Sequence, residues 1–235
     1  MIYFCLTNNS NIKLFDYLIF TPKLSSNKIL LLVLELTRYP SIFIGHGMGG
    51  VVATGFAAKF PSLVASIALI SPMGVKFSYA PKEKLLKKRY FGEYLMLKRK
   101  LMIPGWEEDH FYQRGDNVPH RTLIDKQINM VKWQIDNTPG YLGAILSVYR
   151  YFPIRGMEEL YTAIGRHARP VLVIWGDHDT ICPYRKSMVK MEKCFPNGCL
   201  IDTRDCGHNP VAEKFKETVA ELLSFAKESS DILRA

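Results

Sequence analysis

Three short stretches of the sequence hold residue types that could do chemistry. A glycine-dense turn, "GHGMGG", occupies residues 45–50 and joins an apolar segment to a run of small residues. Farther along, "WGDHDTICP" at 175–183 and "DCGHNP" at 205–210 carry carboxylates and histidines just after segments with the pattern of short strands. Carboxylate and imidazole groups are common proton-transfer groups of enzymes. General acid–base chemistry is therefore open to this chain if its fold brings the three stretches together.

The glycine-dense turn resembles the nucleophile elbow of the α/β-hydrolases, G-x-S-x-G, in which a strand turns tightly into a helix. Gly45 and Gly49 stand two residues before and two after the centre, where small residues avoid a clash, and His46 lies between Gly45 and the centre. Met48 follows the centre, so its backbone N–H at the helix N-terminus would be one oxyanion-hole donor. The centre itself, which the family's motif gives to serine, is Gly47.

Two further stretches match the same family in the same chain order. "WGDHDTICP" resembles the W-G-x-x-D-x-x-x-P segment that carries the acid of the catalytic triad, which implies that Asp179 is that acid. "DCGHNP" resembles the G-H segment that carries the base, which implies that His208 is that base. Nucleophile, acid and then histidine is the order of α/β-hydrolases. We interpret His46 and His178 as solvent-exposed or packing residues.

Gly47 changes the chemistry that the resemblance implies. Glycine has no side chain, so it can neither attack an ester carbonyl nor carry an acyl group. The resemblance implies hydrolysis of a carboxylic ester or lipid-like substrate, and we expect this chain to be an inactive or strongly impaired relative. Two other interpretations stay open. In the first, the protein is a pseudoenzyme that binds a small molecule or a partner. In the second, it is an enzyme in which the His208–Asp179 pair acts as a general base.

The alternation of strands and helices predicts an α/β fold. The predicted strands lie within 41–45, 63–72, 169–183 and 198–210. The predicted helices lie within 24–40, 48–61, 184–195 and 211–228. Such alternation indicates βαβ crossovers and a mostly parallel sheet with helices on both faces. The family resemblance implies that the three stretches lie at the carboxyl ends of the strands.

Residues 73–165 break this alternation, because they are largely helical by pattern and interrupted by proline and glycine. We interpret them as a helical cap, or lid, inserted into the core. Residues 1–72 are then the N-terminal part of the core, which includes the elbow, and residues 166–235 are its C-terminal part, which carries the acid and histidine loops.

The stretch 82–102 within this cap carries eight Lys or Arg residues. Five apolar residues recur in it at spacings of three and four, which predicts one apolar helix face. They are Leu86, Tyr90, Tyr94, Leu97 and Leu101. Either this helix touches an anionic membrane or lipid headgroup, or its apolar face covers the site while its lysines are solvated. The ligand expected at the site is a small-molecule ester or a lipid-like molecule.

The start of the chain departs from the family pattern. Counting back from the elbow, "MIYFCL" at residues 1–6 takes the place of the strand before the elbow strand, and the earlier strands are missing. The H-G loop that gives the second oxyanion donor is missing with them. One strand of the family's sheet also normally lies between "MIYFCL" and "SIFIG", so we expect unpaired backbone groups there unless the neighbours close up. A shortened isoform or an incomplete gene model is expected to have this appearance.

Composition sets further bounds. The chain has 235 residues, of which 48% are hydrophobic, enough for one core with an insertion. Its five cysteines form no C-x-x-C pair, no H-E-x-x-H occurs, and "GHGMGG" is not a dinucleotide-binding pattern, so we expect no disulfide framework, metal or cofactor. The net charge of +9 comes with no nucleic-acid-binding motif, so no nucleic-acid partner is expected. We find neither a signal peptide nor a transmembrane run and expect an intracellular, cytoplasmic protein.

Overall fold

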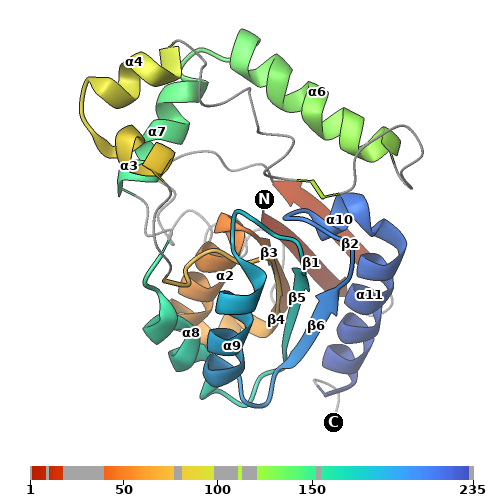
Figure 1. The fold of residues 1–235 in the computed structure, drawn as a ribbon. Coiled ribbons are helices and arrows are strands. Elements are labelled where there is room, and N and C mark those ends of the chain that lie inside the picture. Colours follow the sequence, from red (N-terminus) through yellow and green to blue (C-terminus); the bar gives the residue numbers. More distant parts are fainter. Residues whose placement is uncertain are drawn as a thin grey trace.

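The structure, a computed structural model, describes residues 2–8, 11–17, 40–76, 81–97, 111–112, 121–151 and 155–232. The described part is built on one six-stranded sheet, with helices on both faces and more helices above one edge (Figure 1). In spatial order the strands are β2 (Asn11–Tyr17), β1 (Ile2–Asn8), β3 (Ser41–His46), β4 (Val64–Ile70), β5 (Val171–Gly176) and β6 (Cys199–Thr203).

Strands β3 to β6 are parallel. β3 pairs with β4, β4 with β5 and β5 with β6, each in parallel register. Every residue of β5 is buried, and so is nearly all of β4, as expected of continuous apolar strands covered on both faces. The predicted fold class, a mostly parallel α/β sheet, is confirmed.

The first two strands differ from this pattern. β1 and β2 form an antiparallel hairpin, in which Asn8 lies opposite Asn11. β1 also lies directly beside β3 and antiparallel to it, with Ile2 opposite Gly45. The neighbours of the expected gap have therefore closed up, which is the alternative that the sequence analysis gave to unpaired backbone groups between "MIYFCL" and "SIFIG".

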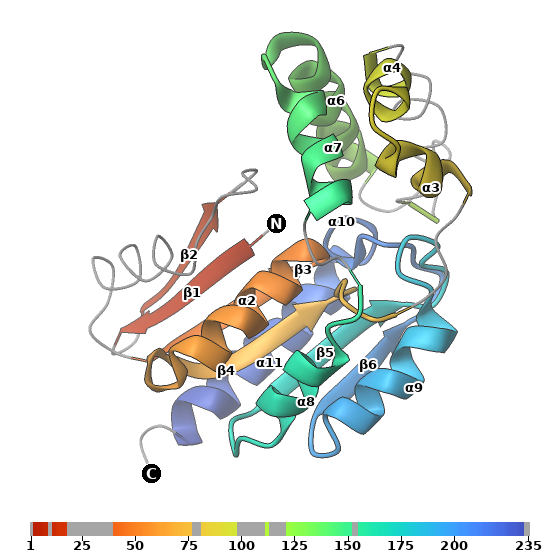
Figure 2. The ribbon, with the colours of Figure 1, turned by 90° about the vertical axis from the view of Figure 1, so that its left-hand side faces the viewer.

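Described helices cover both faces of the sheet (Figures 1 and 2). The helices on one face are α2 (Met48–Lys59), α8 (Glu158–Gly165) and α9 (Tyr184–Cys194). Their side chains join those of the strands in a large core cluster, for example Phe56 stacked on Phe43. On the other face, the part of the chain that the structure describes has α11 (Phe215–Ile232), whose Phe225 packs against Ile42 and its neighbours.

Above the carboxyl ends of the parallel strands stand further described helices, which we call the cap helices (Figure 2). They are α3 (Pro81–Lys87), α4 (Phe91–Leu97), α6 (Arg121–Asn137) and α7 (Tyr141–Tyr151). The prediction of one continuous helix over 82–102 is wrong. Residues 88–90 form a turn between α3 and α4, where Tyr90 has a φ of 64°, so Leu86 is 4% exposed whereas Tyr90 is 75% exposed.

The chain segments that lead into and out of the cap helices lie side by side. Gly74 and Arg155 form a parallel bridge, and the Met157 N–H donates to the Gly74 carbonyl at 2.7 Å. Lys76 N donates to the Glu158 carboxylate, also at 2.7 Å. Helix α8, which falls within 73–165, packs against α2 and α9 in the core and not among the cap helices. The three-part division of the chain stays a prediction.

Two of the helices predicted from the sequence are not found as predicted in the described residues. The helix expected at 211–228 is interrupted at Lys214, because α10 (Pro210–Glu213) ends there before α11 begins. The helix expected at 24–40 falls almost wholly outside the described residues. Among the described helices, none combines the length and apolar character needed to cross a bilayer.

Candidate active site

The glycine-dense turn has the strained geometry of an elbow. β3 ends at His46, α2 begins at Met48, and Gly47 between them has φ 56° and ψ −118°, which L side chains rarely adopt. The Gly47 N–H donates to the Ile70 carbonyl at 2.9 Å, and its own carbonyl accepts from Gly50 and Met73. The turn is therefore held by the backbone at both ends of its central residue.

Close packing explains the first glycine of the turn. A Cβ on Gly45 would lie 2.5 Å from the Gly49 carbonyl oxygen and 2.7 Å from Cα of Gly50, closer than such atoms approach in proteins. The start of α2 thus lies directly against the end of β3. Met48 is the first residue of α2, so its N–H belongs to the turn whose N–H groups have no acceptor inside the helix.

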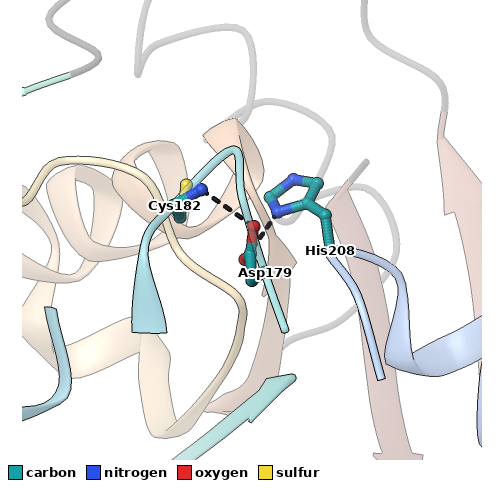
Figure 3. Close-up of side chains that lie close together, drawn as sticks. All are labelled: Asp179, Cys182 and His208. Carbon is teal, nitrogen blue, oxygen red and sulfur yellow. Dashed lines mark hydrogen bonds and ion pairs between the residues drawn. The ribbon is translucent and has the colours of Figure 1, made fainter. Parts of the chain in front are cut away.

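The two other motifs meet beside this elbow. Asp179 follows β5 and His208 follows β6, both at the carboxyl ends of their strands, and they are 5% and 4% exposed. Nδ1 of His208 lies 2.9 Å from Oδ2 of Asp179 (Figure 3). A carboxylate at Nδ1 favours the tautomer that carries its proton there, which directs Nε2 to act as the base.

The Asp179 carboxylate is held by its own loop. Its Oδ1 accepts the backbone N–H groups of Ile181 and Cys182 at 2.9 and 2.8 Å. Its Oδ2 accepts the Trp175 indole N–H at 3.2 Å in addition to the contact with His208. These donors fix the orientation of the carboxylate toward the histidine.

The histidine faces the centre of the elbow. A Cβ placed on Gly47 would lie 3.2 Å from Nε2 of His208 and 3.7 Å from its Cε1. The structure thus brings together positions 47, 179 and 208, as the motifs imply. Their catalytic roles stay predictions.

His46 has a more specific place than predicted. Its Nε2 lies 2.7 Å from the His208 carbonyl oxygen, and the two rings are 4.9 Å apart. The side chain therefore joins the elbow to the histidine loop, and the interpretation as a solvent or packing residue missed this contact. The x of a G-x-S-x-G pattern carries no signal that would have indicated it.

Glu213 is a buried residue that the sequence analysis did not single out. It is 0% exposed, and its Oε1 accepts the N–H of Gly207, next to His208, at 2.9 Å. Its Oε2 accepts the N–H of Tyr112 at 2.8 Å. One carboxylate thus ties the histidine loop to the segment before α6. Burial, together with the nearby Glu213 charge, raises the pKa of the Cys206 thiol far above its usual value.

Further contacts between the cap segment and the two loops surround Glu213. The Tyr112 ring stacks on the His178 ring with centroids 3.8 Å apart. Asn209, directly after His208, donates to the Gln127 side chain on α6. Phe111 packs with Ile124, Ile128 and Ala212 in a small buried cluster. The described cap residues therefore rest on both the acid loop and the histidine loop.

Among the described residues, one group of side chains has the atom types of a metal site. An oxygen of Asp179, the sulfur of Cys182 and a nitrogen of His208 all lie within 4.8 Å of one another (Figure 3). Zinc accepts this donor set. The Asp179 oxygens already accept four hydrogen bonds, however, one of them from His208. The arrangement therefore fits a hydrogen-bonded acid–base pair better than a metal centre.

A family model described as "alpha/beta hydrolase fold" matches residues 22–215. The chain therefore belongs to the α/β-hydrolase family. It is similar to lipase 1 of Psychrobacter immobilis, with 28% identity over 183 residues, 77% of this chain and 54% of that lipase. It is also similar to monoacylglycerol lipase ABHD6 of Mus musculus, with 26% identity over 197 residues, 82% of this chain and 56% of that protein. The chain spans about half the length of the curated relatives that it matches.

Solved structures show the same fold. A thermophilic esterase superposes with a TM-score of 0.64 at 19% identity, covering 87% of this chain and 73% of the esterase. A 2-hydroxy-6-oxo-6-phenylhexa-2,4-dienoate hydrolase from Rhodococcus sp. strain RHA1 superposes with a TM-score of 0.64 at 21% identity, covering 86% and 69%. A bacterial membrane phospholipase A gives 0.60 at 19%, covering 87% and 62%. The protein is thus an α/β-hydrolase related to lipases and monoacylglycerol lipases.

Proposed function

We propose that this protein binds an ester or lipid-like acyl ligand beside the elbow and has lost hydrolysis through an acyl-enzyme. The observation that carries the proposal is the distance of 3.2 Å between His208 Nε2 and the position of a Cβ on Gly47. A base oriented by Asp179 lies where a serine side chain would need it, and the side chain is the missing part.

The ligand class is argued from the relatives. Two of them are a lipase and a monoacylglycerol lipase, and both names imply a glyceride ester. The N-terminus of α2, with Met48 as its first residue, offers N–H groups to a carbonyl oxygen or a carboxylate. We expect the ligand to be a lipid ester or the fatty acid released from it. The cytoplasmic location expected from the sequence stays a prediction.

A second candidate is hydrolysis with water as the nucleophile, favoured by the intact His208–Asp179 contact. In this reaction a water molecule gives one proton to Nε2 of His208 while its oxygen bonds to the acyl carbon. The same proton then passes to the leaving alkoxide, so no acyl-enzyme forms. This candidate requires turnover without a burst phase, and turnover that His208→Ala abolishes.

The test is ester hydrolysis by the native protein beside Gly47→Ser, with p-nitrophenyl esters of short and medium chain. Removing the nucleophile of a serine protease lowers kcat by about 10⁶. Because Gly47→Ser restores that nucleophile, it should raise kcat by several orders of magnitude over the native protein, up to about 10⁶.

Matched variants separate the effects of the serine oxygen from those of the added Cβ. Gly47→Ala adds the same Cβ at a φ of 56° without the hydroxyl and should stay inactive. Gly47→Ser combined with His208→Ala should lose most of the gain, since no base would activate the serine. Equal activity of the serine and alanine variants would refute the proposal that the missing hydroxyl is what silences the site.

Ligand binding needs its own measurement, because restored hydrolysis does not prove that the native protein holds a ligand. A monoacylglycerol ether, which cannot be hydrolysed, is titrated into the native protein in a calorimeter. Saturable binding that His208→Ala weakens supports the proposed site. No binding by the native protein, or binding that is not saturable, would contradict it.

A further inference from the structure

Residues 85–94, which include the turn between α3 and α4, expose several large apolar side chains. Leu85, Tyr90, Phe91 and Tyr94 are 36%, 75%, 47% and 52% exposed. Single exposed apolar residues are ordinary, whereas several within ten residues of chain mark an interaction site. These four side chains stay exposed because other residues of α3 and α4 make the contacts with the neighbouring helix α7.

Those packing residues hold the segment against the rest of the cap. Leu86 and Met96 are buried with Leu146 of α7 in one cluster. Arg150 of α7 donates to the backbone carbonyls of Leu86 and Lys88. The segment that carries the exposed aromatic residues is therefore anchored to α7 by packing and hydrogen bonds.

Exposed cations accompany the aromatic residues. Lys84, Lys87, Lys88 and Arg89 are all exposed, and the Arg89 guanidinium lies 5.1 Å from the centre of the Tyr90 ring. The chain from 84 to 97 contains a single acidic residue, Glu93. Arg150 pairs with Glu93 through both carboxylate oxygens, and these bonds lower the Glu93 pKa to about 2. The one negative charge of the segment is thus countered within the protein.

We propose that residues 84–94, which we call the α3–α4 patch, dock on the surface of an anionic lipid membrane. Aromatic side chains at the headgroup level together with lysine and arginine are the composition of an interfacial membrane contact. Charge complementarity therefore selects an anionic bilayer as the occupant of the patch.

The position of the patch fits the proposed ligand. In both ribbon views α3 and α4 stand on the same side of the sheet as the carboxyl ends of the parallel strands (Figures 1 and 2). A membrane at the patch would lie on the side of the molecule where the elbow is. This part of the inference rests on the proposed function, because it assumes that the ligand is a lipid.

The test is co-sedimentation of the native protein with vesicles of phosphatidylcholine alone or with one quarter phosphatidylglycerol. We expect binding to the anionic vesicles and much weaker binding to the neutral ones. Raising the salt to 1 M shortens the screening length to about 3 Å and should weaken the anionic binding. No ester turnover is measured, so a failure of the proposed hydrolysis chemistry does not affect the outcome.

Two pairs of substitutions test the patch itself. Lys84→Gln with Lys88→Gln should lower the partition coefficient roughly 25-fold, equivalent to about 2 kcal/mol at about 1 kcal/mol for each basic residue. Tyr90→Asn with Tyr94→Gln should also weaken binding, and here the loss should persist at 1 M salt. Asparagine is chosen because it tolerates the positive φ of residue 90.

The matched control removes the same charge elsewhere. Lys186 and Lys193 are exposed on α9, and changing both to Gln gives the same net charge as the Lys84 and Lys88 pair. We expect less than a threefold effect from this control. An equal loss from both pairs would mean that net charge alone drives binding and would overturn the proposal. So would a native protein that binds no vesicles and forms a dimer that the Tyr90 and Tyr94 changes dissociate.

Discussion

Glu213 offers a sharp test of how the histidine loop is held. Its buried carboxylate accepts the N–H of Gly207 through one oxygen and that of Tyr112 through the other. Glu213→Gln keeps the shape and one carbonyl oxygen, but it replaces the second acceptor by an NH₂ group. One of the two backbone N–H groups then faces a donor and loses its hydrogen bond.

The expected magnitude follows from that single loss. A hydrogen bond to a charged group contributes about 1.5–3 kcal/mol, so we expect Glu213→Gln to lower the free energy of unfolding by about 2 kcal/mol. For a protein of this size such a loss lowers Tm by roughly 4–8 °C. Glu213→Ala removes both acceptors and leaves a cavity, and it should cost about 4 kcal/mol.

Thermal and urea unfolding at pH 7 measure these effects. Glu217→Gln is the control, because Glu217 is an exposed glutamate on the adjoining helix and should change stability by no more than about 0.5 kcal/mol. A second reading comes from the Gly47→Ser background, where Glu213→Gln should lower kcat more than it raises KM, since it loosens the residue before His208. If Glu213→Gln and Glu217→Gln unfold alike, the reasoning about this carboxylate is refuted.

Three further predictions concern other parts of the molecule. Bonding to Arg150 lowers the Glu93 pKa from 4.5 to about 2. The Tm difference between the native protein and Glu93→Gln should therefore be complete above pH 4.5 and vanish as the pH falls through about 2. A Tm difference that is unchanged at pH 2 would contradict this. Gly45→Ala should destabilise the fold by about 1–3 kcal/mol in urea unfolding, since its Cβ meets backbone that cannot yield. Among the cysteines with described side chains, native Ellman titration should modify exposed Cys199 fast, and rapid reaction of the buried ones would contradict the packing. The buried ones are Cys182, Cys194 and Cys206.

Much of the core could be predicted from the sequence because its elements are strongly patterned. β4 and β5 are mostly apolar runs bounded closely by proline or glycine, and α2 ends just before Pro61, as expected of a residue that cannot continue a helix. The split into α3 and α4 was missed because the apolar spacing favours one helix. Gly92 lies against the Leu86 backbone, a contact between segments that no periodicity reveals.

The candidate site likewise has residues that the sequence predicts and residues that only the structure shows. Asp179 and His208 were predictable because they occur in motifs with fixed spacing, and the structure brings their side chains within 2.9 Å. His46 contacts the backbone of His208, and Glu213 contacts that of Tyr112, both distant in sequence, so only the fold shows these contacts. The docking of Tyr112 on His178 is likewise a tertiary contact without a local signal.

The most direct test of the central claim is intact-mass spectrometry after treatment with a fluorophosphonate probe, which phosphonylates an activated serine. We predict no adduct on the native protein, a single adduct on Gly47→Ser, and none on Gly47→Ser combined with His208→Ala. A His208-dependent adduct on the native protein would mean that another side chain is the nucleophile. That result would contradict the claim that Gly47 leaves an assembled acid–base pair without the group it would activate.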